Sequence, residues 1–142
     1  MASVFSYLFP YQTYTYELKG NDTYFISRLG HFIQETNDKY QPGKHYIYHD
    51  AQKREFSFRR KHLNPGAGSG GLFRFTYLFQ DNKTYIVCRM GYSPFLYFLF
   101  IFFSLITFMV VYLPVNLFFQ MEAFIVRDDF EIYFKEDILV RR

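Results

Sequence analysis

The chain has 142 residues, a length that favours one domain. Half of the residues are apolar and almost a quarter are aromatic, which excludes a disordered chain because disordered segments are poor in aromatics. The net charge of +3 is too mild to indicate a nucleic-acid partner. Cys88 is the single cysteine, so no disulfide can form within the chain, and this favours a compartment that is not oxidising.

Five runs of residues before Tyr92 alternate with the two-residue period of a half-buried strand. Tyr and Phe dominate these runs and suit a pleated surface. A short turn at residues 81–83 predicts an antiparallel hairpin between the last two runs. The five predicted strands are residues 13–18, 45–50, 54–59, 72–79 and 84–90.

One helix is predicted between the first two strands. Asn21 or Asp22 can cap it, and the apolar residues that follow have helical spacing. Those residues are Phe25, Ile26, Leu29, Phe32 and Ile33. The predicted fold class is therefore α+β: an antiparallel sheet of about five strands with one helix, in the order β-α-β-β-β-β, followed by one transmembrane helix and a short tail. The domain boundaries predicted are 1–92 for the α+β domain, 93–114 for the membrane helix and 115–142 for the tail.

The transmembrane helix is predicted from residues 95–113, which contain no charged residue and no amide. At about 1.5 Å per residue the segment is roughly 28 Å long, close to the hydrocarbon thickness of a bilayer. Ser93 suits the N-cap and Pro94 the first turn, while Pro114 is expected to end or kink the helix. A membrane hairpin of two helices is disfavoured because the uncharged run is too short for two crossings. The residues expected in the span include Phe95, Leu99, Phe103, Ile106, Val110 and Leu113.

The predicted location follows from charge and from the N-terminal segment. The N-terminal domain has twelve Lys or Arg against seven Asp or Glu, and residues 1–10 lack the apolar run of a signal peptide. A single-pass membrane protein with its N-terminal domain on the cytoplasmic side is therefore expected, with the mitochondrial inner membrane as the alternative. In the partly amphipathic tail, residues 117–125 can continue the helix beyond a kink, and residues 130–140 alternate weakly like a strand.

A basic cluster lies in and after the third predicted strand. The interpretation favoured most is a solvated strand face, followed by a surface for anionic lipid headgroups. Nucleic acid is the least favoured partner, although nearby aromatics suit stacking. The candidate headgroup-binding residues are Lys53, Arg54, Arg59, Arg60 and Lys61, beside His62.

No set of residues indicates catalysis, a metal or a cofactor. His45 and His49 share one strand face but lack a third ligand nearby, and Cys88 is predicted to be a core residue. Residues 64–71 are rich in glycine, but a strand follows them where a nucleotide-binding loop needs a helix. We therefore expect a protein that is not an enzyme, with no catalytic residue, no metal ligand and no cofactor.

The stretch Phe9-Pro10-Tyr11-Gln12-Thr13, followed by a final strand hairpin and an apolar span, resembles a group of small bacterial membrane proteins of the Bacteroidota. These proteins are uncharacterised and have a short α+β domain with a single span. The resemblance implies that fold and no activity. The excess of Phe and Tyr is also similar to that of small accessory subunits encoded by AT-rich organellar genomes.

Two functions remain open from the sequence. The first is a non-catalytic accessory or structural subunit of a larger membrane protein complex, because aromatic side chains dominate interface energetics. The alternative is a membrane-tethered binding or sensor domain that recognises anionic lipid headgroups or a small ligand. The partners expected are the lipid bilayer and other membrane protein subunits, without nucleic acid.

Overall fold

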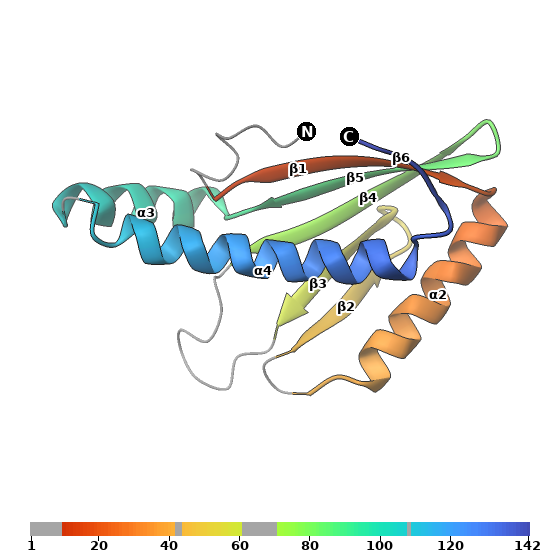
Figure 1. Ribbon diagram of the computed structural model, residues 1–142, viewed down its shortest axis with the longest axis horizontal. Coiled ribbons are helices and arrows are strands. Elements are labelled where there is room, and N and C mark those ends of the chain that lie inside the picture. The colour runs from red at the N-terminus through yellow and green to blue at the C-terminus, as the bar shows by residue number, and fades with distance from the viewer. Residues whose placement is uncertain (1–9, 42–43, 61–70, 108) are drawn as a thin grey trace.

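The computed structural model describes residues 10–41, 44–60, 71–107 and 109–142. These residues form an α+β fold with one six-stranded antiparallel sheet and three helices (Figure 1). The strands are ordered β2-β3-β4-β5-β1-β6 across the sheet. In chain order the elements are β1 (Gln12–Lys19), α2 (Asp22–Asp38), β2 (His45–Asp50), β3 (Glu55–Arg60), β4 (Leu72–Gln80), β5 (Lys83–Gly91), α3 (Pro94–Ile106), α4 (Tyr112–Tyr133) and β6 (Ile138–Arg141).

The first five strands and α2 coincide with the elements expected before Tyr92. Alternation in β4 explains why: Phe73, Phe75 and Tyr77 are buried, while Arg74 and Thr76 between them are exposed. The sheet nevertheless has six strands where about five were expected. The added strand, β6, comes from the tail and pairs antiparallel with β1.

Helix α2 packs on the sheet through one apolar stripe. Asn21 caps its start, because the Asn21 side chain accepts a hydrogen bond from the backbone N–H of Tyr24 at 3.0 Å. Phe25, Leu29 and Phe32 follow at helical spacing and are buried. The rings of Phe25 and Tyr77 lie 5.2 Å apart, which places the stripe against β4.

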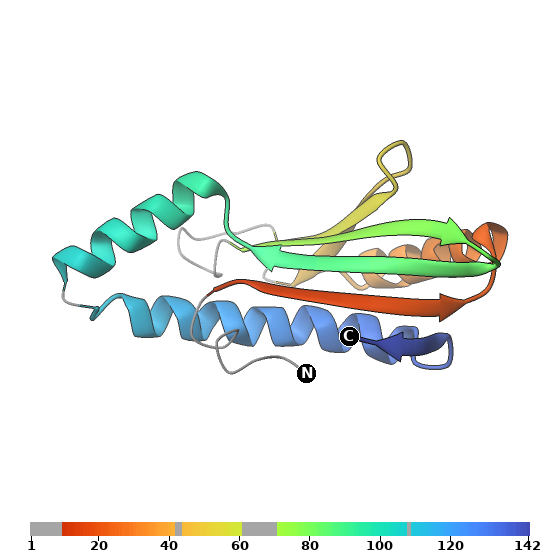
Figure 2. The same ribbon diagram turned by 90° about the horizontal axis from the view of Figure 1, so that it is seen from above.

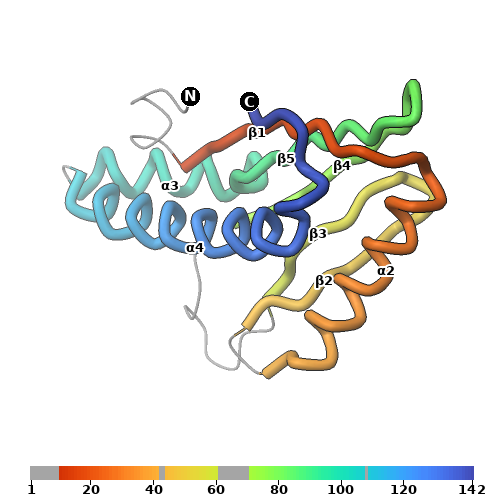
Figure 3. Tube along the Cα trace, turned by 45° about the vertical axis from the view of Figure 1, so that its right-hand side comes forward, coloured from red at the N-terminus to blue at the C-terminus, as the bar shows by residue number. Residues whose placement is uncertain are grey.

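Helix α4 packs against the same core as α2 and runs alongside β1 (Figure 2). Its buried stripe includes Phe119, Ala123, Val126 and Phe130. The Phe130 ring lies 4.9 Å from the ring of Phe75 on β4. Figure 3 shows α2 running obliquely to α4, with α2 and α3 at opposite ends of the molecule.

The predicted transmembrane helix is wrong. The apolar segment from Phe95 to Leu113 is divided between α3, which has 13 residues, a turn, and the start of α4. Within the described parts of the chain, no helix combines the length and the apolar character that a membrane crossing requires. This corrects the single-pass architecture, the classification as a single-pass membrane protein drawn from it, and the location that placed the N-terminal domain on the cytoplasmic side of a span.

The chain reverses because the turn after α3 uses a left-handed backbone conformation. Met109 has a φ of 71°, and its N–H donates to the carbonyl of Ser104 at 2.7 Å. Thr107 caps α3 with its N–H bonded to the carbonyl of Phe103. Pro114 was expected to end or kink a helix but lies in the first turn of α4, where its missing N–H costs little. Helices α3 and α4 thus form a hairpin that extends beyond the sheet (Figure 2).

Candidate functional site

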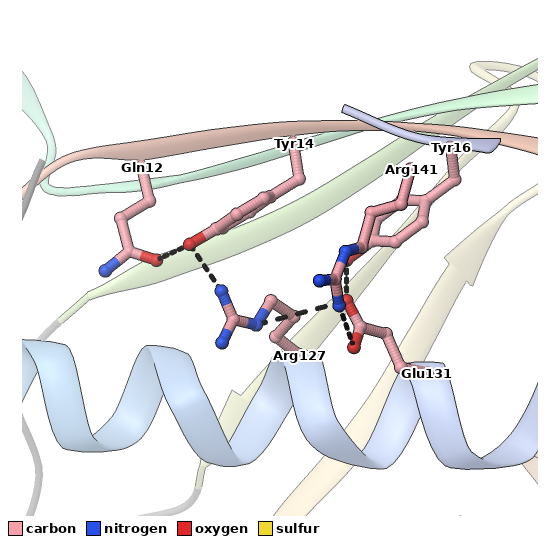
Figure 4. Close-up of polar contacts among 6 residues, drawn as sticks. All are labelled: Gln12, Tyr14, Tyr16, Arg127, Glu131 and Arg141. Carbon is pink, nitrogen blue, oxygen red and sulfur yellow. Dashed lines mark hydrogen bonds and ion pairs between the residues drawn. The ribbon is translucent and has the colours of Figure 1, made fainter. Parts of the chain in front are cut away.

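A chain of polar contacts joins α4 to β1 and β6. We call it the polar seam, and Figure 4 shows its six residues: Gln12, Tyr14, Tyr16, Arg127, Glu131 and Arg141. Arg127 donates to the Tyr14 hydroxyl at 2.6 Å, and that hydroxyl donates to the Gln12 side chain at 2.8 Å. Glu131 accepts from the Tyr16 hydroxyl at 2.8 Å and from Arg141 at 2.9 Å.

The polar seam has the chemistry of a structural clamp. Burial, together with the hydrogen bond to Glu131, raises the pKa of the Tyr16 hydroxyl far above its ordinary range, so this phenol stays protonated. Each charge in the seam has a partner of opposite sign: Glu131 pairs with Arg127 on the same helix and with Arg141 on β6. The seam therefore fixes α4 and β6 against β1 and presents no free acid or base.

The histidines and the cysteine singled out in the sequence are bonded or buried inside the fold. His45 Nε2 lies 2.8 Å from a carboxylate oxygen of Glu122, and both side chains are buried. His49 Nε2 lies 2.8 Å from the hydroxyl of Tyr77. Burial raises the pKa of the Cys88 thiol, which disfavours a reactive thiolate. The described residues contain no group of three or more side chains suited to a metal ion.

The most unusual surface of the protein is the outside of the helical hairpin. Between Arg89 and Glu122 the sequence contains no charged residue. Apolar side chains on both helices and on the turn are nevertheless exposed, with Val110 and Leu113 each 71% accessible. We define the hairpin surface as Phe95, Leu96, Phe98, Ile101, Phe102, Phe103, Leu105, Ile106, Met109, Val110, Leu113, Leu117, Phe118, Met121, Phe124 and Ile125.

The residues expected in a membrane span belong to this hairpin. Five of the six are exposed: Phe95, Phe103, Ile106, Val110 and Leu113. Leu99 is half-buried and lines a groove of about 290 Å³ between the two helices. The prediction placed these residues in one membrane-spanning helix, whereas they lie on two helices and a turn.

Four backbone N–H groups in and beside the hairpin turn are hydrogen-bonded. The N–H groups of Thr107, Met109, Val110 and Tyr112 each donate to a backbone carbonyl within the turn or the adjoining helices. The hydroxyl of Thr107 donates to the carbonyl of Phe103 at 2.7 Å. Each of these bonds lowers the cost of moving the turn out of water.

The structure separates the predicted headgroup-binding cluster. Lys53 and Arg54 lie in the turn between β2 and β3, whereas Arg59 and Arg60 lie at the other end of β3. Arg59 projects from the exposed face of the sheet, where its guanidinium lies 4.1 Å from the centre of the Tyr48 ring. Lys61 and His62, like most of the glycine-rich loop, lie outside the described residues.

Two arginines that were not selected from the sequence lie beside Arg59. Arg74 on β4 and Arg89 on β5 are directly opposite each other in the strand pairing, and both are exposed. Like charges in this position destabilise a sheet by roughly 0.2–1 kcal/mol. The sequence contained the signal: the tight turn at residues 81–83 sets the register of the two predicted strands, and that register pairs Arg74 with Arg89.

Comparisons with known proteins found no matching family model, no matching curated protein and no matching solved structure. The resemblance through the stretch that starts at Phe9 therefore stays a prediction.

Proposed function

We propose that this protein is a non-catalytic attachment domain whose hairpin inserts into one leaflet of a lipid bilayer and holds the sheet at the surface. The observation that carries the proposal is an uncharged hairpin surface that surrounds more than half of α3. Viewed down the axis of α3, the exposed apolar side chains cover an arc of about 220° at 3.6 residues per turn, and Ile101 and Leu96 mark its two edges. A core-facing helix needs an apolar arc of only about 100°.

Lipid explains this arc better than one protein surface does. A protein partner covers mainly the face of a helix that it contacts, whereas acyl chains surround it. At the tip, the N–H donors of Thr107, Met109, Val110 and Tyr112 are bonded, which lowers the cost of moving this part of the turn into hydrocarbon. With 13 residues, α3 extends about 20 Å at 1.5 Å per residue, which is longer than one leaflet and shorter than a bilayer core of about 30 Å.

Tyrosines at the base of the hairpin support the same orientation. Tyr97 in the first turn of α3 donates to the carbonyl of Pro10 at 2.7 Å, and the exposed Tyr11 follows in the chain. Tyrosine is enriched where the apolar core of a bilayer meets water. The tip is therefore the deepest part of the inserted hairpin, and the sheet stays in water.

Vesicle flotation tests this proposal. The wild-type protein is expected to float with neutral phosphatidylcholine vesicles, and the double variant Val110→Asp/Leu113→Asp is expected to bind at least about tenfold more weakly. The reason is that one aspartate inside a bilayer-embedded helix costs about 2.5–3.5 kcal/mol. Both sites are exposed near the turn, so the substitutions leave the core intact.

The matched control places two aspartates on exposed apolar residues outside the hairpin surface: Leu78 on β4 and Ile132 near the C-terminal end of α4. Leu78→Asp/Ile132→Asp should float like the wild type. Equal flotation of the two double variants, or wild-type protein that stays with the vesicle-free fraction, contradicts insertion of the hairpin.

A second candidate function, an accessory subunit of a larger protein complex, is supported by the groove between α3 and α4. Its volume of about 290 Å³ can accept a large apolar side chain of a partner, and its lining is almost wholly apolar: Tyr92, Leu96, Leu99, Phe100, Phe103, Val111 and Val115. If this function is correct, the wild type co-purifies from its native source in a fixed ratio with one larger protein and does not bind neutral vesicles. Substituting Leu99, which lines the groove, then abolishes recovery.

A further inference from the structure

We propose that Arg59, Arg74 and Arg89 form a binding site for the phosphate group of an anionic phospholipid, on the exposed face of the sheet beside the hairpin. This inference rests on the proposed insertion of the hairpin, and it assigns a lipid class and a set of residues that the insertion alone does not. We call the three side chains the arginine row.

The strand register brings hydrogen-bond donors into one line across the sheet. Tyr48 is opposite Ser57, Ser57 is opposite Arg74, Arg74 is opposite Arg89, and Arg89 is opposite Thr13. Residues opposite each other in an antiparallel pair lie about 5 Å apart, so neighbouring donors can reach the same small anion.

Arg59 lies on β3, two residues after Ser57, and adds a third guanidinium beside this line. Its Nε donates to the Ser57 hydroxyl at 3.3 Å, and its guanidinium lies over the Tyr48 ring. A guanidinium held flat in this way has lost part of its rotamer freedom before any ligand binds. Arg59 and Arg74 also line one hollow of about 560 Å³, together with Lys53 and Arg60 and with the carboxylates of Asp50, Glu55 and Glu122.

The charges of the arginine row have no counterpart among the described residues. Neither Arg74 nor Arg89 has a hydrogen bond or ion pair to any described residue. Of the acidic residues on the same sheet face, Asp50 and Glu55 lie two residues along their strands from the row, and Glu17 lies four residues from it. A phosphate between the paired guanidinium groups relieves their repulsion and accepts two-pronged hydrogen bonds from each.

The position of the row selects a phospholipid as the source of the phosphate. Arg89 lies two residues before Gly91, the last residue of β5, and α3 begins at Pro94. At about 3.3 Å per residue the row is roughly 7 Å from the end of the sheet at which the hairpin starts. When the hairpin lies in a leaflet, lipid phosphates come within reach of these long side chains.

The test compares neutral phosphatidylcholine vesicles with vesicles that also contain phosphatidylglycerol. The wild type should bind the anionic vesicles at least tenfold more tightly, and added salt should remove most of this increment. Arg74→Gln/Arg89→Gln should lose the increment and keep the affinity for neutral vesicles. The matched control Lys39→Gln/Lys135→Gln removes the same charge from two exposed positions at the ends of α2 and α4, outside the hollow, and should keep the increment.

Each other outcome overturns the assignment. An increment that survives in Arg74→Gln/Arg89→Gln, or that the control variant loses to the same extent, excludes the arginine row as the site. Binding of glycerol phosphate to the vesicle-free protein, without an increment on anionic vesicles, would assign the row to a free phosphate compound. Failure of the hairpin proposal is distinguishable, because then the neutral vesicles show no binding at all. Equal thermal unfolding of the variants in vesicle-free buffer verifies that each is folded.

Discussion

At the scale of single residues, the polar seam shows how buried polar groups specify one arrangement of the elements. Glu131 is bonded by Tyr16 from β1 and by Arg141 from β6, so one carboxylate joins three elements. Sliding α4 by one turn would separate Glu131 from Tyr16 and Arg141, and such a shift is costly because buried polar side chains that lack a partner destabilise the fold. The seam thus selects the register of α4 on the sheet, which apolar packing alone leaves less defined.

The variant Tyr16→Phe measures this contribution. Removing the hydroxyl should lower the free energy of unfolding by about 1.5–3 kcal/mol, the range for a hydrogen bond to a charged group, because Glu131 then lacks one donor in a part-buried site. Urea unfolding followed by circular dichroism provides the measurement. Tyr133→Phe is the control, since its half-buried ring packs on Phe32 and Phe134, and these contacts survive the change. Equal losses in both variants would show that the seam adds nothing.

Residue patterns also explain which side chains could be selected in advance. Phe25, Leu29 and Phe32 were expected on one helix face, and all three are buried. Cys88 was expected in the core and is buried as well. The arginine row was not selected from the sequence because its members come from three strands. The turn at residues 81–83 indicates the pairing of Arg74 with Arg89, but only the pairing of β3 with β4 brings Arg59 to the same region of the sheet.

At the scale of elements, the hairpin depends on the turn rather than on the composition of its helices. The apolar residues from Phe95 onward would suit one continuous helix, yet Met109 adopts a positive φ and reverses the chain. An L-residue in this conformation costs roughly 1–2 kcal/mol, which the packing of α4 on the sheet must offset. The ring contacts of Phe119 with Phe73 and Tyr92 show where this compensation arises.

The variant Met109→Gly tests this account. Glycine adopts a positive φ without steric cost, so the variant should be more stable than the wild type by up to about 1 kcal/mol. Val110→Gly, one residue later, is the control and should lose roughly 0.5–1 kcal/mol, because glycine only adds chain entropy there. Thermal unfolding compares the two. Destabilisation by Met109→Gly equal to that of Val110→Gly would mean that the left-handed conformation does not limit the turn.

At the scale of the whole molecule, two opposite kinds of surface meet at one end. The core between the sheet, α2 and α4 is filled by aromatic side chains and resembles that of a water-soluble domain. The hairpin surface is apolar and exposed, which water does not favour over an area of this extent. Without lipid or a partner, the protein should cover the hairpin surface with further copies of itself.

Self-association therefore provides a prediction for the intact chain. In detergent-free buffer the wild type should elute as oligomers or aggregates in size-exclusion chromatography with light scattering, because the hairpin surface is buried by association. Val110→Asp/Leu113→Asp should shift the distribution towards the monomer, whereas Leu78→Asp/Ile132→Asp should not. A wild-type monomer at high concentration would contradict the view that the hairpin surface needs a cover.

The sequence by itself determined the local structure: alternation set the first five strands, helical spacing and the cap at Asn21 set α2, and composition marked the uncharged segment after Arg89. These features depend on neighbours in the chain, so periodicity reveals them. Only the tertiary structure decided that this segment folds back at Met109, that α4 lies against β1, and that β6 joins the sheet. An apolar run records that its side chains avoid water, and whether protein, lipid or another copy covers them depends on contacts made far away in the chain.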